Sequence, residues 1–86
     1  AADAQIEIDL PAGAEIITAP VSGTVWKLLT EAGQQINQQE TILVIESMKM
    51  EFPVPAPANG VVLQLFCKPG NYVAAGQALC VLHHER

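Results

Sequence analysis

The residues best suited to chemistry lie together near the middle of the chain, at positions 46–53. Lys49 carries an amine that can be acylated, and it stands between two thioether side chains, Met48 and Met50. Glu46 and Glu51 add local negative charge on either side of this trio. These five residues are the candidate functional site.

The local sequence at Lys49 does not match an ordinary β-turn. The other candidate turns of the chain carry Gly, Asn or Pro, because tight hairpin loops often need a positive φ. Met48 and Lys49 are poor choices for such a loop. A turn here would therefore be held in a costly conformation, and such conformations concentrate at functional sites.

A second interpretation of the same residues is an uninterrupted strand. Alternation would then place Lys49 on the solvent-facing side, as an ordinary surface lysine. The opposite face would carry the remaining side chains in steps of two: Val44, Glu46, Met48, Met50 and Phe52.

An internal repeat favours the turn. Residues 17–47 align without a gap on residues 54–84, at an offset of 37. The matches include an Ala-Pro pair and both turn glycines of each half: Ala19-Pro20 with Ala56-Pro57, Gly23 with Gly60, and Gly33 with Gly70. Two copies of one β-unit must fold back on each other, and Lys49 lies at the joint between them.

Turn residues recur about every ten positions, between short β-branched and aliphatic runs, which predicts an all-β sandwich or barrel. The expected strands are residues 15–19, 24–29, 35–37, 41–46, 54–56, 61–66, 72–74 and 79–83. Within 24–29, alternation predicts Val25, Lys27 and Leu29 on one side of the strand and Thr24, Trp26 and Leu28 on the other. Residues 1–14 are expected to be a linker or an extra N-terminal strand at 5–10, and residues 15–84 the domain.

Composition excludes several classes of protein. The 86 residues carry nine acidic and four basic side chains, a net charge of −5, which argues against a nucleic-acid partner. No apolar run approaches the ~20 residues of a membrane helix, and no secretory signal is visible. The prolines at 53, 55 and 57 remove alternate N–H groups, which predicts that the strand there is an outer one or is bulged.

The cysteines and histidines do not predict a catalytic or metal site. Cys67 and Cys80 lie too far apart for a zinc motif, and we expect two reduced, buried thiols of a cytoplasmic protein. His83 and His84 are expected to belong to a fraying end of the chain. No general base, nucleophile or metal site is predicted.

The segment Ile-Glu-Ser-Met-Lys-Met-Glu at 45–51, followed by Ala-Pro-Ala-Asn-Gly-Val-Val at 56–62, strongly resembles the biotinyl (biotin carboxyl carrier) domain of biotin-dependent carboxylases. The resemblance implies a barrel-sandwich hybrid, which is a flattened barrel of two four-stranded antiparallel sheets with a pseudo-twofold repeat. It also implies covalent biotin on Lys49 at a hairpin tip, flanked by Met48 and Met50. Ser47 replaces the alanine that the family commonly has.

The same resemblance implies a non-catalytic carrier. Its biotin would be attached by a biotin protein ligase, with Glu46 and Glu51 helping recognition, and would carry carboxylate from a biotin carboxylase site to a carboxyltransferase site. The stretch Val-Ser-Gly-Thr-Val-Trp-Lys at 21–27 and the core at 46–51 look similar to carboxylases of the urea type, which we prefer to the acetyl-CoA, pyruvate and acyl-CoA types. The alternatives are a lipoyl carrier, whose family usually shows Asp-Lys-Ala at this place, and an unmodified barrel-sandwich binding module.

Overall fold

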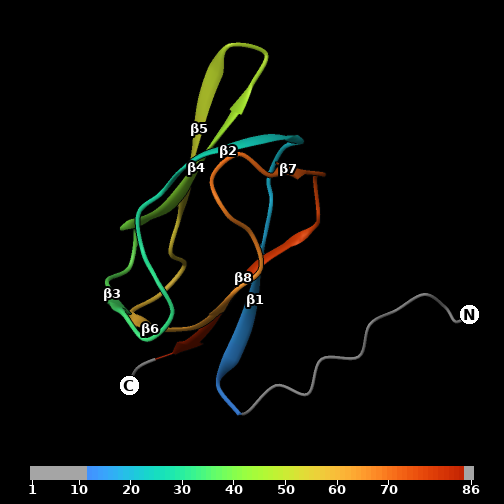
Figure 1. Ribbon diagram of the computed structural model, residues 1–86. Helices are drawn as coiled ribbons and strands as arrows, with labels where there is room; N and C mark the ends of the chain where they lie inside the picture. The colour runs from blue at the N-terminus through green and yellow to red at the C-terminus, as the bar shows by residue number, and fades with distance from the viewer. Residues whose placement is uncertain (1–11, 85–86) are drawn as a thin grey trace, which may run out of the picture.

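The computed structural model describes residues 12–84, which form eight β-strands and, within that range, no helix that could cross a membrane. Two antiparallel four-stranded sheets result, with the strand orders β1-β8-β6-β3 and β5-β4-β2-β7 (Figure 1). The predicted fold class is confirmed. The strands are β1 (Ala14–Thr18), β2 (Gly23–Leu28), β3 (Gln35–Ile36), β4 (Thr41–Ser47), β5 (Met50–Pro55), β6 (Gly60–Leu65), β7 (Tyr72–Val73) and β8 (Ala78–His84).

The internal repeat is also a repeat of structure. Strands β2, β3 and β4 coincide with β6, β7 and β8 at the offset of 37 residues. The register repeats as well, since Val25 pairs with Ile45 in the first half and Val62 with Leu82 in the second. Each sheet contains strands of both halves, so neither half can bury its apolar face alone.

The core lies between the two sheets and is filled by the inward side chains of both. Alternation along the strands sends aliphatic residues inward in both halves. The inner strands β4 and β8 also bury four consecutive residues each. The largest fully buried side chains come equally from the two copies of the repeat: Val25, Ile36, Ile42, Leu43 and Ile45 from the first, and Val62, Val73, Leu79, Cys80 and Leu82 from the second.

The predicted alternation of residues 24–29 is wrong beyond Val25. The register of β2 against β4 shifts between Val25 and Lys27, which is a β-bulge. Because a bulge adds one residue to the strand, the inward positions move from odd to even numbers. Leu28 therefore packs against the core, whereas Trp26 is exposed with the Lys27 ammonium 4.5 Å from its ring centroid.

Strand β5 is an edge strand, as its prolines predicted. Ser47 and Met50 face each other across the hairpin, and so do Ile45 and Phe52. Since hydrogen-bonded pairs alternate along an antiparallel ladder, residues 51, 53 and 55 direct their backbone groups away from β4. Pro53 and Pro55 thus occupy positions where an N–H would have no partner in this sheet.

Both cysteines are buried free thiols, as expected. Burial, and secondarily the nearby Cys67, raises the pKa of the Cys80 thiol to about 12. Burial also raises the pKa of Cys67. The repeat places Thr30 where the second half has Cys67, and its buried hydroxyl has no hydrogen-bond partner among residues 12–84.

The expectation of a fraying end at the two histidines is wrong. His83 and His84 belong to β8, where His83 pairs with Ala14 and the His84 backbone N–H donates to Gly13. His84 Nε2 also lies 2.6 Å from Glu15 Oε1. Within the described range, no three His, Cys, Asp or Glu side chains gather as they would around a metal ion. The strand expected at residues 5–10 lies outside this range, and the domain boundary at residue 15 stays a prediction.

Candidate functional site

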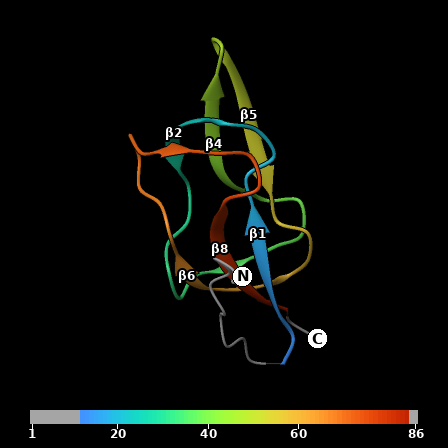
Figure 2. The same cartoon turned by 90° about the vertical axis from the view of Figure 1, so that its right-hand side faces the viewer.

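Lys49 lies at the tip of the hairpin that joins β4 to β5. This hairpin extends beyond the other strands in both views (Figures 1 and 2), at the end of the molecule opposite to the start of β1. Ser47 and Met50 form its last pair, so the loop consists of Met48 and Lys49 alone. The turn interpretation of the joint is therefore correct, and the uninterrupted strand is not.

Both loop residues have a left-handed backbone conformation, with φ of 51° at Met48 and 67° at Lys49. Positive φ at both central positions is the arrangement of a type I′ hairpin turn, whose twist matches that of the flanking strands. For residues with a Cβ this conformation costs roughly 1–2 kcal/mol each. The strain that the sequence indicated is thus present, and the ladder from Ser47–Met50 downward holds it in place.

The side chains at the tip are open to solvent. Met48 is 92% exposed and Met50 60%, which is unusual for large apolar residues. Lys49 is exposed, and within residues 12–84 no hydrogen bond or ion pair restrains its ammonium group. The amine is therefore accessible from solvent.

Glu46 and Glu51 face each other directly across the hairpin, immediately below the tip. Both are exposed, and like charges at this spacing disfavour the pair by a few tenths of a kcal/mol, roughly up to 1. The same cross-strand row continues through Thr24 on β2 to Tyr72 on β7, which is 68% exposed. The sequence predicted the two carboxylates but not Tyr72, since pairing between distant strands decides which residues join the row.

Gly23 supports the base of the hairpin for a reason that the turn prediction missed. A Cβ at this position would lie 2.4 Å from the backbone oxygen of Glu46 and 2.9 Å from Cγ2 of Ile45. Its φ is not in the left-handed region, so the missing side chain matters through close approach and not through turn geometry. Gly60 has the same role at His83, where a Cβ would lie 2.2 Å from the backbone oxygen.

A β-sandwich of two like halves, with a strained hairpin that presents an exposed lysine where they meet, is the arrangement expected of a carrier domain for a covalently attached cofactor. The family model described as "Biotin-requiring enzyme" matches residues 6–82. The chain belongs to this biotin and lipoyl attachment family, as a domain of the biotin carboxyl carrier type. The resemblance found in the sequence is confirmed.

Individual relatives agree with this assignment. Over 66 residues the chain is 41% identical to the biotin carboxyl carrier protein of acetyl-CoA carboxylase from Solanum lycopersicum, covering 77% of this chain and 94% of that protein. Over 77 residues it is 34% identical to urea amidolyase from Lachancea kluyveri, covering 90% of this chain but 4% of the enzyme. A solved single-chain, multi-domain long-chain acyl-CoA carboxylase superposes with a TM-score of 0.83 at 26% identity, covering 93% of this chain and 8% of that one. The chain thus matches nearly the whole of one carrier protein and small parts of large carboxylases.

Proposed function

We propose that Lys49 is the biotinylation site and that the domain carries carboxylate on its biotin between two active sites. The observation that supports this most directly is the conformation of the tip. An exposed lysine without a partner in the described structure occupies a two-residue turn in which both residues are left-handed. Lys27, in contrast, lies against Trp26, and Lys68 lies in a loop closed by the Asn71 side chain.

The attachment chemistry requires an amine that a ligase can surround. Neutral Nζ of Lys49 attacks the activated carboxyl carbon of biotin, the leaving group departs with its electron pair, and the nitrogen loses a proton as the amide forms. The lysine charge disappears in this step, so the tip becomes apolar between Met48 and Met50. These flexible thioethers provide adaptable contacts for several partners.

When bound, biotin supplies a ureido nitrogen that can carry carboxylate. The chain's own residues hold and orient the arm: the paired strands fix the position of Lys49, and the exposed tip lets it enter each partner's active site. A covalent tether raises the effective concentration of the carried group at both sites without new contacts. The domain contributes no catalytic residue, and we expect the isolated chain to carry out neither ATP hydrolysis nor carboxyl transfer.

Glu46 and Glu51 are proposed to assist recognition by the biotin protein ligase. They form a negative pair beside the amine on an exposed sheet face, and rim charges of this kind mainly change association rates. We expect E46Q and E51Q to lower kcat/KM of the ligase for this domain by up to about tenfold, without unfolding it. The matched control is E31Q, in the loop that follows β2, which should leave the rate unchanged.

The partners would be a biotin carboxylase and a carboxyltransferase. The urea type is our preferred parent, supported by the similarity to urea amidolyase over 90% of the chain. We place the protein in the cytoplasm, where two free cysteine thiols would stay reduced. Coupled assays that supply urea, acetyl-CoA or pyruvate to the assembled carboxylase would identify the acceptor.

Intact mass spectrometry tests the attachment site. Co-expression with a biotin ligase should add one biotinyl group to the chain, and K49R should accept none. The control variants K27R and K68R each replace one of the other two lysines and keep Lys49, so both should be fully biotinylated. Biotin on K49R would disprove the assignment of Lys49, and modification by a lipoate ligase alone would assign the domain to the lipoyl carriers.

A further inference from the structure

The outer face of the sheet β5-β4-β2-β7 carries an exposed row of side chains directly below the Lys49 hairpin. The row has one residue from each strand, in the order of the sheet: Glu51, Glu46, Thr24 and Tyr72. Directly opposed residues point to the same side of a sheet, and all four side chains are exposed. Figure 1 shows β2 and β7 beside the base of the protruding hairpin, so the row leads sideways from the base of the hairpin across the whole sheet.

The bulge of β2 adds a second aromatic side chain to this face. Val25 before the bulge and Leu28 after it point toward the core. The two residues between them, Trp26 and Lys27, are exposed and therefore point outward. Trp26 lies diagonally from Tyr72 across the ladder of β2 and β7, a spacing that aromatic side chains can bridge. The two rings are 45% and 68% exposed, respectively.

The aromatic part of this face rests on an apolar base. Val44 pairs with Lys27 on one side and with Pro53 on the other. It is buried, yet it does not belong to the core cluster between the sheets. Because Val44 points outward, its neighbours on the outer face cover it, Trp26 among them. A ring that is already packed in this way loses little conformational freedom when a partner binds it.

The repeat supplies a corresponding row on the other sheet, and the side chains differ there. At the offset of 37 residues the second row consists of Ala14, His83, Val61 and Gln35. Both carboxylates and the tyrosine are replaced, and Leu63 stands in the place of Trp26. The two faces thus share one backbone arrangement but differ in charge and aromatic content. The acidic and aromatic face is the one beside Lys49.

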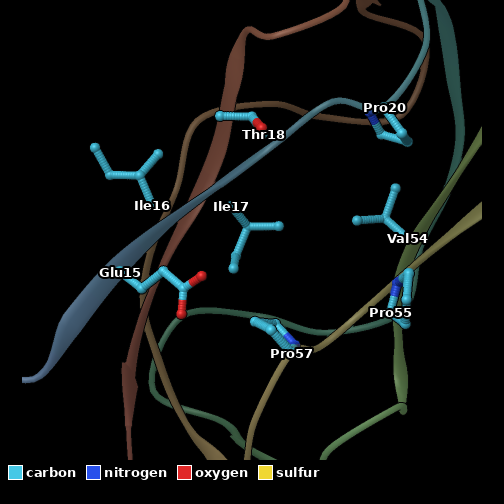
Figure 3. Close-up of a pocket in the computed structure, with 8 residues that line it drawn as sticks. All are labelled: Glu15, Ile16, Ile17, Thr18, Pro20, Val54, Pro55 and Pro57. Atoms are coloured by element: carbon cyan, nitrogen blue, oxygen red, sulfur yellow. The ribbon is translucent and has the colours of Figure 1, made fainter.

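The edges of this sheet offer little main-chain pairing to a partner. Strand β7 has only two residues, and β5 has Pro53 and Pro55 at positions that face away from β4. Figure 3 shows Pro55 and Pro57 along the groove of about 280 Å³ that separates β5 from β1. A partner of this sheet must therefore bind the side chains of its face.

A protein that acylates Lys49 needs more contact than the tip offers. Specific interfaces bury about 800 Å² on each partner, far more than two loop residues supply. The hairpin has two faces, and the inner one leads into the core at Ile45, which is fully buried. Only the outer face continues as exposed surface, from Glu46 to Tyr72. Contacts with this face would also distinguish Lys49 from Lys68.

The charges of this face specify the chemistry of the partner. Glu46 and Glu51 form a non-hydrogen-bonded pair, in which side chains lie close together, and no ion pair within residues 12–84 compensates them. A guanidinium between them would donate to both carboxylates and remove their repulsion. We propose that the biotin protein ligase docks on this face, with an arginine between Glu46 and Glu51 and apolar side chains against Tyr72 and Trp26. The inference rests on the proposed biotinylation of Lys49.

Steady-state biotinylation tests the proposal, with the unmodified domain as the varied substrate of a biotin protein ligase. Y72S removes the exposed ring and should raise KM at least about tenfold, while kcat changes less than about twofold, since the lost contact is equal in the ground and transition states. W26S should also raise KM. The matched control L63S removes the repeat counterpart of Trp26, which is 42% exposed on the opposite sheet, and should keep the parental KM.

A competitor that cannot react separates docking from chemistry. K49R keeps the face but has no amine to acylate, so it should inhibit biotinylation of the parent domain competitively. Y72S/K49R should inhibit at least about tenfold more weakly, whereas L63S/K49R should match K49R. Added NaCl should weaken the inhibition by K49R, and should weaken it less when E46Q and E51Q are also present, because exposed charges are screened by salt.

The docking inference is wrong if Y72S keeps the parental KM, or if K49R does not inhibit, in an assay in which the parent domain is biotinylated on Lys49. It is also wrong if Y72S converts a dimer of the domain into a monomer in sedimentation, which would assign the face to a second copy of the chain. A parent domain that accepts no biotin on Lys49 would contradict the proposed function, and the docking inference with it.

Discussion

Replacing Gly23 with alanine is the most informative perturbation of the hairpin base. The new Cβ would lie 2.4 Å from the Glu46 backbone oxygen, and real Cβ contacts are not shorter than 3.0 Å. The two strands must therefore separate by more than half an ångström where they are hydrogen-bonded. Overpacking of this kind costs about 1–3 kcal/mol. The smaller backbone entropy of alanine in the unfolded chain offsets about 0.5 kcal/mol of this cost.

We expect G23A to lower the free energy of unfolding by about 2 kcal/mol, a large fraction of the stability of a domain this small. For a domain of this length, that loss corresponds to a decrease in Tm of roughly 8–16 °C. Urea titrations followed by Trp26 fluorescence and by circular dichroism measure it directly. A variant within 0.5 kcal/mol of the parent would refute the close-approach argument.

Gly60 supplies a matched control from the other half of the repeat. G60A creates the same contact with the His83 backbone oxygen, at 2.2 Å, and should be destabilised by a similar amount. It lies away from Lys49, so biotinylation of the folded protein should slow in G23A and stay near the parental rate in G60A. Equal rates in the two variants would show that the position of Glu46 does not affect access to the tip.

Three further outcomes concern stability. T30V replaces a buried hydroxyl that has no partner among residues 12–84 with a methyl group of similar size. In urea unfolding the variant should be more stable by about 1 kcal/mol. A destabilised variant would indicate a bound water at this hydroxyl. Gln39 has a φ of 73° at the position where the second half of the repeat has Gly76. Q39G should relieve this backbone strain and raise the free energy of unfolding by roughly 0.5 kcal/mol. A less stable variant would mean that the Gln39 side chain contributes more than the strain costs. Burial raises the pKa of Cys80 to about 12 in the folded state, so the thiol loses its proton at lower pH in the unfolded chain. The free energy of unfolding should therefore fall between pH 9 and 12, by at most about 1.4 kcal/mol per pH unit from this group. C80V should reduce this slope, and an unchanged slope would assign the alkaline loss to other groups.

Much of this architecture was predictable because the repeat occurs in the sequence itself. The gapless alignment of the two halves predicted which turns correspond, and seven of the eight expected strands lie within one residue of the observed bounds. Strand β5 is the exception, since it begins at Met50 and not at residue 54. Its first residues carry no β-branched signal, and they pair with β4 because the hairpin brings them together.

The position of Lys49 was predictable from the contradiction between a turn and residues unsuited to turns. Which residues surround it was not. Tyr72 reaches the row of Glu46 and Glu51 through β2, and Gly23 lies beneath the hairpin because two backbones approach there. Both relations join segments that are far apart in the chain, and no local pattern encodes such distances.

The amino-acid sequence by itself determined the duplicated β-unit, the edge strand marked by prolines and the lysine at the joint, because alternation, proline and turn chemistry act over a few neighbouring residues. The tertiary structure decided the bulge at Trp26, the close contact at Gly23 and the exposed row that ends at Tyr72. These depend on how the ladders of two packed sheets align, and that alignment is the outcome of burying both halves at once.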